Sequence, residues 1–308
     1  MARSAFQFEL IILLALALLP CRATAVSFSL DPASPSIDGN ATPDDILLGG
    51  SGVHVQGSNL GLAADLFWGF YDNLDALSYG ADPLGEPLLF SVDRLAVGLP
   101  GTAVGAEAGS LEASGDIFRN SPSGTNSLEV DEETLGLAPG FFGDDLNALA
   151  FGLPLNGLAY FSIDSLSASN GFGALGLADD ILMSGGTGSF QIFADGVTNM
   201  GLLDGDDLDA LLLWDVFEPG TLNPGVDAAL FSLSPFSWSG WSPGDILLTD
   251  FSGGHVLYAS AADLGLDFFD DVNALSAQSQ PIPEPGTLVL FGTGLAGILG
   301  WGRRRRTQ

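Results

Sequence analysis

The sequence predicts an all-β fold in which four repeats of about four strands each form a small four-bladed β-propeller. Three observations lead to this prediction. The 42 glycines and 17 prolines among 308 residues are typical of a chain with many turns between short strands. Hydrophobic residues make up 46% of the chain, which suffices for a packed core and argues against disorder. Four short signatures also recur in a fixed order between residues 26 and 280.

Each of the four signatures occurs four times. The first has the form Phe-Ser-Leu/Val/Ile-Asp/Ser and occupies residues 28–31, 90–93, 161–164 and 231–234. The second, Asp/Gly-Asp-Ile-Leu/Phe, occupies residues 44–47, 115–118, 179–182 and 244–247. The third, Leu/Met-Gly-Leu, occupies residues 60–62, 135–137, 200–202 and 264–266. The fourth begins with Asp-Asp or Asp-Asn, ends with Ala-Leu, and occupies residues 72–77, 144–149, 206–211 and 270–275.

The repeat favours a radial arrangement of sheets. Each unit contains about four strand candidates separated by Gly, Pro and Asp turns. One four-stranded sheet cannot bury both of its faces alone, so the sheets must stack or surround an axis. The range 26–280 begins with the first signature and ends with the last, so the two ends can pair and protect edge strands. A β-solenoid and a β-sandwich are the alternatives that remain open.

The fourth signature accounts for much of the acidity. In a strand, alternation places Leu208 and Ala210 on one face and Asp209 on the other. The leading aspartates then lie at the strand entry, where carboxylates accept backbone N–H bonds in Asx-turns. Calcium binding is the alternative, because a hard cation prefers clustered oxygen ligands, and four copies near an axis would form a ring of carboxylates. The densest group of possible calcium ligands is Asp204, Asp206, Asp207 and Asp209.

Charge and residue content exclude several function classes. The formal net charge is −30 without a single lysine, and such a surface repels nucleic acid. Cys21, the only cysteine, lies in the N-terminal leader, which excludes disulfides and cysteine chemistry in the mature protein. His54 and His255 occupy similar places in two repeats, as expected for a strand position rather than a zinc pair. We therefore predict a non-enzymatic protein with no catalytic residue.

Two features keep other functions open. Paired carboxylates are abundant, so a secreted polysaccharide hydrolase that uses a carboxylate pair is the alternative to a non-enzymatic protein. Acidic pairs in every repeat fit architecture better, because an active site normally occurs once. Trp238 and Trp241 lie in the long loop of the last unit. If these rings are exposed they can stack on sugars, and if buried they fill the core of the last sheet.

Residues 1–25 have the features of a secretory signal peptide. Arg3 supplies the positive region, residues 10–19 form an apolar run, and Ala23-Thr24-Ala25 is a small-x-small cleavage site. A lipoprotein reading would use Cys21, but Pro20 before it argues against that reading. The four-repeat β domain would then comprise residues 26–280.

The segment 281–308 has three parts in order. Pro283-Glu284-Pro285 lies in a proline-rich stretch, an uncharged apolar run follows at residues 287–302, and Arg303, Arg304, Arg305 and Arg306 come last. A helix over the apolar run would span about 24 Å, a short transmembrane segment whose arginines stay cytoplasmic. The order of the three parts resembles the PEP-CTERM sorting signal of Gram-negative bacteria.

This resemblance implies how the protein is processed and where it is located. The family's partner is an exosortase, a membrane protease-transpeptidase, which implies processing at or near Pro283-Glu284-Pro285 and only transient contact with the inner membrane. It also implies export to the cell surface or the extracellular matrix of biofilm-forming bacteria that produce exopolysaccharide. From the whole sequence we expect an exported surface or matrix protein that binds exopolysaccharide or calcium.

Overall fold

The computed structural model describes residues 26–37, 41–63, 72–79, 88–121, 124–151, 157–171, 176–215 and 217–277. The chain divides into two compact units, residues 1–278 and 279–308, and all described residues belong to the first. Because the predicted signal peptide and the predicted tail lie outside the described residues, their boundaries stay predictions.

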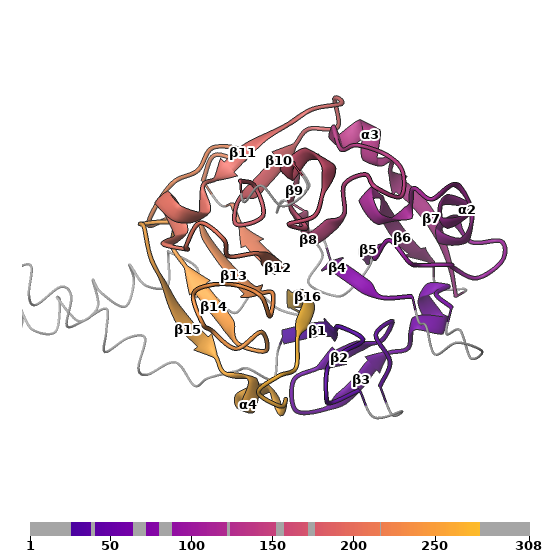
Figure 1. Ribbon diagram of the computed structural model, residues 1–308, viewed down its shortest axis with the longest axis horizontal. Helices are drawn as coiled ribbons and strands as arrows, with labels where there is room; N and C mark the ends of the chain where they lie inside the picture. Colours follow the sequence, from indigo (N-terminus) through magenta and orange to yellow (C-terminus); the bar gives the residue numbers. More distant parts are fainter. Residues whose placement is uncertain are drawn as a thin grey trace, which may run out of the picture. The chain divides into compact units, whose positions relative to one another are not determined.

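The described residues form a four-bladed β-propeller of four antiparallel sheets, each with four strands (Figure 1). Blade 1 consists of β16 (Val272–Ala277), β1 (Val26–Leu30), β2 (Ile46–Leu48) and β3 (Gly52–Val55). Blade 2 consists of β4 (Leu74–Ser78), β5 (Leu89–Val92), β6 (Ile117–Ser121) and β7 (Thr125–Val130). Blade 3 consists of β8 (Leu146–Phe151), β9 (Ala159–Ile163), β10 (Ile181–Ser184) and β11 (Phe190–Ala194). Blade 4 consists of β12 (Leu208–Trp214), β13 (Ala228–Leu233), β14 (Ile246–Thr249) and β15 (His255–Ala259).

Helical segments are short and lie in the connections between strands. In the described ranges, the α-helices are α2 (Ala103–Ser110), α3 (Glu132–Leu135) and α4 (Ala261–Leu264). The other helical turns are η2 (Gly57–Leu60), η3 (Ala113–Gly115), η4 (Ala168–Asn170) and the π-helical η5 (Gly196–Met200). The predicted fold class is therefore confirmed.

The ring is closed by pairing the first described strand with the last. β16 is antiparallel to β1, with Val26 opposite Ala277 and Phe28 opposite Leu275. Blade 1 therefore takes its innermost strand from the C-terminal part of the range and its other three from the N-terminal part. With this closure, each inner strand of the described blades is paired with the second strand of its own blade.

The signatures mark equivalent places in the four blades. The fourth signature provides the innermost strands, β16, β4, β8 and β12, which surround the axis in Figure 1. Their alanines are fully buried, which fits the crowding of four strands at the centre: Ala76, Ala148, Ala210 and Ala274. Hydrophobic clusters fill the spaces between neighbouring blades, so the core is spread around the ring.

The serine of the first signature joins each blade to the next one. In all four copies it is fully buried, and its hydroxyl donates to a main-chain carbonyl of the neighbouring inner strand. The donor–acceptor pairs are Ser29–Leu74 at 2.7 Å, Ser91–Leu146 at 2.9 Å, Ser162–Leu208 at 2.8 Å and Ser232–Val272 at 2.7 Å. One repeated residue therefore satisfies a buried carbonyl at every seam between blades.

The glycine of the third signature ends each helical turn beside the outer hairpin of the next blade. Gly136 has a φ of 93°, and a Cβ atom there would lie 2.5 Å from Cα of Ser189 in blade 3. Gly265 also has a positive φ, 81°, but a Cβ atom there would meet nothing within 4 Å. Glycine is required by backbone conformation at both places, and by close approach only at Gly136.

Candidate functional site

The first aspartate of each fourth signature is committed to the architecture. Asp72 accepts N–H bonds from Ala63 at 2.6 Å and Val97 at 2.7 Å. It therefore joins the segment after η2 to the segment after β5. Its three equivalents likewise accept two main-chain N–H bonds each: Asp144, Asp206 and Asp270. This agrees with the predicted role of these carboxylates as backbone acceptors at the strand entry. Each oxygen of these four carboxylates therefore already accepts a backbone hydrogen bond.

The fourth position of the same signature forms a ring of alternating acids and amides around the axis. Asn147 donates from Nδ2 to Oδ1 of Asp209 at 3.2 Å, and Asn273 donates in the same way to Asp75 at 2.8 Å. All four side chains are buried. The predicted ring of carboxylates is thus half carboxylate and half amide, because each asparagine supplies the donor that a neighbouring aspartate needs.

The second position of the signature lies next to this ring, and its partners differ between blades. Arg94, which follows the first signature of blade 2, donates from Nε to Oδ2 of Asp145 in blade 3 at 2.7 Å. At the next seam, Ser165 is the equivalent residue and hydrogen-bonds to Asp207. We call Asp75, Asn147, Asp209 and Asn273, together with Asn73, Asp145, Asp207 and Asp271, the axial cluster.

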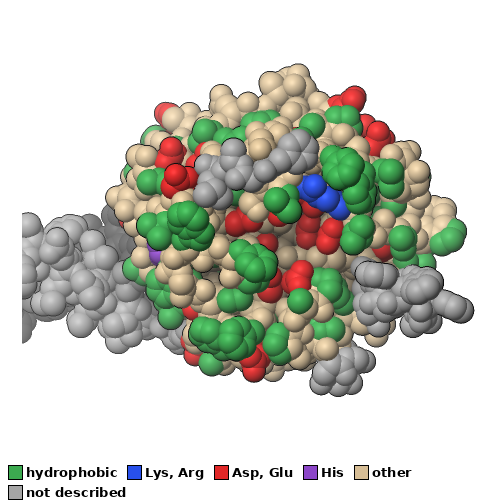
Figure 2. Space-filling model, viewed as in Figure 1, with side chains coloured by type: hydrophobic (Ala, Val, Ile, Leu, Met, Phe, Trp, Pro, Cys, Tyr) green, Lys and Arg blue, Asp and Glu red, His purple; other side chains and the backbone are tan. Residues whose placement is uncertain are grey.

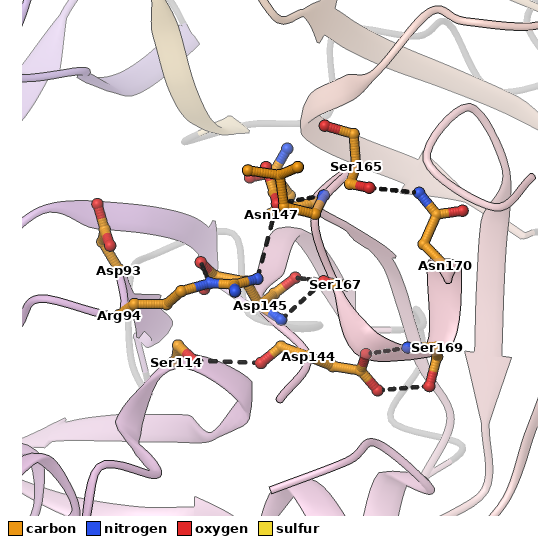
Figure 3. Close-up of polar contacts among 12 residues, drawn as sticks. Asp93, Arg94, Ser114, Asp144, Asp145, Asn147, Ser165, Ser167, Ser169 and Asn170 are labelled. Atoms are coloured by element: carbon orange, nitrogen blue, oxygen red, sulfur yellow. Dashed lines mark hydrogen bonds and ion pairs between the residues drawn. The ribbon is translucent and has the colours of Figure 1, made fainter. Parts of the chain in front are cut away.

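Figure 3 shows the best-neutralised part of the axial cluster, with Arg94 extending toward Asp145 while Asp144 turns away to bond Ser169. The guanidinium also approaches Asp164 at 3.6 Å. Burial, followed by the nearby charge of Asp93, raises the pKa of Asp145 to about 8, and the ion pair with Arg94 opposes this rise.

A second acidic pair in the axial cluster lacks such a cation. Asp209 and Asp271 are only 5% and 7% exposed, and their carboxyl groups lie close enough for each to affect the ionisation of the other. Oδ2 of Asp209 and Oδ1 of Asp271 have no hydrogen-bond partner. Burial raises the pKa of Asp271 to about 7, and burial together with the charge of Asp271 raises that of Asp209 well above its ordinary value.

The four predicted calcium ligands do not form one coordination set. Asp206 accepts backbone bonds, Asp209 belongs to the axial ring, and Asp207 bonds Ser165. Asp204 lies in the turn before them, where it bridges to Asp206. Within the residues that the structure describes, no three or more His, Cys, Asp or Glu side chains are placed to hold a metal ion. Calcium binding itself stays a prediction.

The two predicted sugar-binding tryptophans differ in their surroundings. Trp238 is 66% exposed, and its ring lies against Gly205, where a Cβ atom would approach the ring to 2.9 Å. Trp241 is 37% exposed, and its Nε1 donates to Nε2 of His255 at 3.0 Å. Neither ring fills the core, and Trp238 is the more accessible platform. His54 and His255 lie on the outer strands β3 and β15, as expected for a repeated strand position.

Exposed hydrophobic side chains gather on the loops near the axial cluster. These loops precede the inner strands or connect the second and third strands, so the antiparallel topology places them at one end of the propeller. Figure 2 shows a face with acidic side chains around its middle and hydrophobic side chains around them. The exposed rings and aliphatic side chains on these loops include Leu95, Phe142, Leu166, Phe236, Trp238 and Phe269. We call this end the loop face.

Sequence reasoning missed the pairing of Arg94 with Asp145 and of Asp209 with Asp271. The signal lay in the residue after the first signature, which is Pro32, Arg94, Ser165 or Pro235 in the four units. Aligning the repeats at that position would have singled out Arg94, but only the closed ring shows which aspartate it meets.

Comparison with known families identifies the C-terminal segment. A family model for the PEP-CTERM protein-sorting motif matches residues 281–306. The comparison with curated proteins gave no match. No helix among the described residues is both long enough and apolar enough to cross a membrane, and the predicted span at 287–302 lies outside them. The matched motif marks the chain for export and exosortase processing, with a cell-surface or extracellular location afterwards. The chain therefore combines a four-bladed β-propeller with a C-terminal PEP-CTERM sorting motif.

Proposed function

We propose that this protein is an exported, non-enzymatic surface or matrix protein whose loop face binds exopolysaccharide. The observation that carries the proposal is the combination of exposed aromatic rings and acidic groups on one end of a rigid ring. Aromatic rings stack on the apolar faces of sugars, while carboxylates accept bonds from sugar hydroxyls. Export through the sorting motif brings this face to the place where exopolysaccharide accumulates.

The arrangement of the carboxylates favours binding over catalysis. A glycosidase needs one carboxylate pair that reaches the substrate on both sides of the scissile bond. The leading aspartates already accept backbone N–H bonds, and the best-matched acidic pair, Asp209 and Asp271, is buried. These contacts support a scaffold role for the acidic repeats, with recognition assigned to the loops.

Glycan arrays with the purified full chain test the proposal, and release of reducing ends from bound glycans tests the hydrolase alternative. We expect binding without turnover. Trp238→Ala should weaken binding about fivefold, given that stacking contacts contribute on the order of 1 kcal/mol. The matched control is Phe217→Ala, which removes a 70%-exposed ring from the β12–β13 connection at the other end of the propeller. Turnover, or equal losses in both variants, would refute the proposal.

Mass spectrometry of the native protein tests the processing that the sorting motif implies. We propose cleavage after Ala25 and at or near Pro283-Glu284-Pro285. The intact mass of the protein from its native host should lack residues 1–25 and the arginine cluster. A mass that retains residues 303–306 would contradict cleavage at the proline-rich motif.

A further inference from the structure

The four seams between blades share one frame but differ in charge. At each seam, the residue at the fourth position of the fourth signature in one blade lies beside the residue at the second position of the same signature in the next blade. The 1–2 seam has two amides, Asn273 and Asn73, and so carries no charge. The 3–4 seam has one amide and one acid, Asn147 and Asp207, with Ser165 as a donor. The 1–2 seam is therefore uncharged, and the 3–4 seam carries a single acid.

The other two seams carry two acids each, and only one of them has a cation. At the 2–3 seam, Asp75 is electrostatically coupled to Asp145, and Arg94 pairs with Asp145 at 2.7 Å. At the 4–1 seam the acids are Asp209 and Asp271, and the residue equivalent to Arg94 is Pro235, which has no side-chain donor. The chain therefore supplies a positive charge at one two-acid seam and omits it at the other.

Asp145, Asp207, Asp209 and Asp271 each have an unpartnered carboxylate oxygen, and among the described seams the 4–1 seam places two of these acids side by side without a cation. Asp209 Oδ2 and Asp271 Oδ1 face no donor although both side chains are more than nine-tenths buried. A buried carboxylate without a partner is costly, and two in contact are more so. Either a proton or a cation must be taken up to compensate.

We propose that the carboxylates of Asp209 and Asp271 bind a hard divalent cation, with Ca²⁺ as the probe, in the role that Arg94 has at the 2–3 seam. An inorganic ion suits the site better than a bulky ligand ammonium, because both acids are buried. Two carboxylates are fewer than the three that would make a closed acidic set, so water and neutral oxygens complete the shell. Affinity is accordingly that of a weak extracellular site, a Kd of about 10⁻⁴ to 10⁻³ M.

Protons compete with the ion. A proton and the ion bind the same carboxylate oxygens, so calcium affinity should rise with pH. The proposal does not depend on glycan binding, so failure of one leaves the other intact.

The test uses the full chain, freed of metal with EDTA and dialysed to pH 8. Calcium binding is followed by equilibrium dialysis and by thermal unfolding. At a free Ca²⁺ concentration ten times the Kd, the unfolding constant should fall about tenfold. Asp209→Asn and Asp271→Asn each imitate a side chain that the chain itself uses at the equivalent position of another blade, so both variants should fold. Each should weaken binding at the seam at least tenfold.

Two further variants separate this site from general attraction to an acidic surface. Asp75→Asn makes the same change in charge at the seam that has Arg94, and should leave the calcium response unchanged. Pro235→Arg places a guanidinium where the 2–3 seam has one, and should abolish the calcium response of the 4–1 seam. Equal responses in wild type, Asp209→Asn and Asp271→Asn would overturn the proposal, as would no response at 10 mM Ca²⁺, about ten times the weakest expected Kd.

Discussion

The 2–3 seam and the 4–1 seam share the same serine–carbonyl hydrogen bond but differ in the side chains at the axis and at the rim. Both have a first-signature serine that donates to an inner-strand carbonyl, Ser91 at 2.9 Å and Ser232 at 2.7 Å. The 2–3 seam adds an ion pair at the axis and a tight glycine contact at the rim, whereas the 4–1 seam has neither. Main-chain-directed bonds therefore hold the blades together, which leaves neighbouring side chains free to diverge.

The largest expected effect is at the rim of the 2–3 seam. Gly136→Ala should destabilise the protein by about 2–4 kcal/mol, because it adds left-handed strain and a clash with Ser189. Gly265→Ala at the 4–1 seam meets open space, so only the strain of about 1–2 kcal/mol remains. Urea denaturation of both variants measures the difference, and equal losses would show that the close approach is unimportant.

Removal of the cation from the 2–3 seam should have the next largest effect. Arg94→Met leaves Asp145 buried without its partner and should cost about 2–3 kcal/mol, less than a fully buried pair because the arginine is 18% exposed. The control is Arg119→Met, whose exposed pair with Glu129 contributes at most about 1 kcal/mol. A cost no greater than that of the control would mean that Asp145 is protonated in the native protein.

The pH dependence of stability should separate the seams further. The pKa of Asp271 in the folded protein, about 7, lies above its ordinary value, so its stabilising contribution is complete below about pH 4 and is lost as the pH rises through 7. In calcium-free buffer, wild-type stability should fall between pH 5 and pH 7, by up to about 1.4 kcal/mol per pH unit for one proton. Asp271→Asn should show a weaker dependence of stability on pH. A dependence equal to that of the wild type would show that another group takes up this proton.

The smallest effect expected is at the seam serines. Ser91→Ala should cost about 1 kcal/mol, since Leu146 then loses its side-chain donor. Ser162→Ala should cost about 0.5 kcal/mol, because Nδ2 of Asn147 still donates to the carbonyl of Leu208 at 3.0 Å. Chemical denaturation with the double variant Ser162→Ala/Asn147→Ala checks whether the two donors substitute for each other.

The fold could be predicted because the repeat is visible in local sequence. Phe-Ser and the signature that begins with Asp-Asp or Asp-Asn and ends with Ala-Leu recur with the spacing of one blade. A radial arrangement follows from the need to bury both faces of each sheet. The contacts within the axial cluster were harder to predict from the sequence. Asp207 and Asp209 look alike in sequence, but one faces Ser165 and the other Asp271, and these contacts cross from one repeat to the next. No periodicity within a unit encodes them.

The pairing of β16 with β1 sets an order of events for the newly made chain. β1 is translated first, yet its inner partner spans residues 272–277 and is translated some 240 residues later. Until then β1 presents an unsatisfied backbone edge, the kind of template that recruits strands from other molecules. Premature termination before Val272 would therefore leave a ring with a permanent gap, prone to join its neighbours edge to edge. Cleavage of the sorting tail after Ala277, by contrast, would leave β16 paired with β1 and the ring closed.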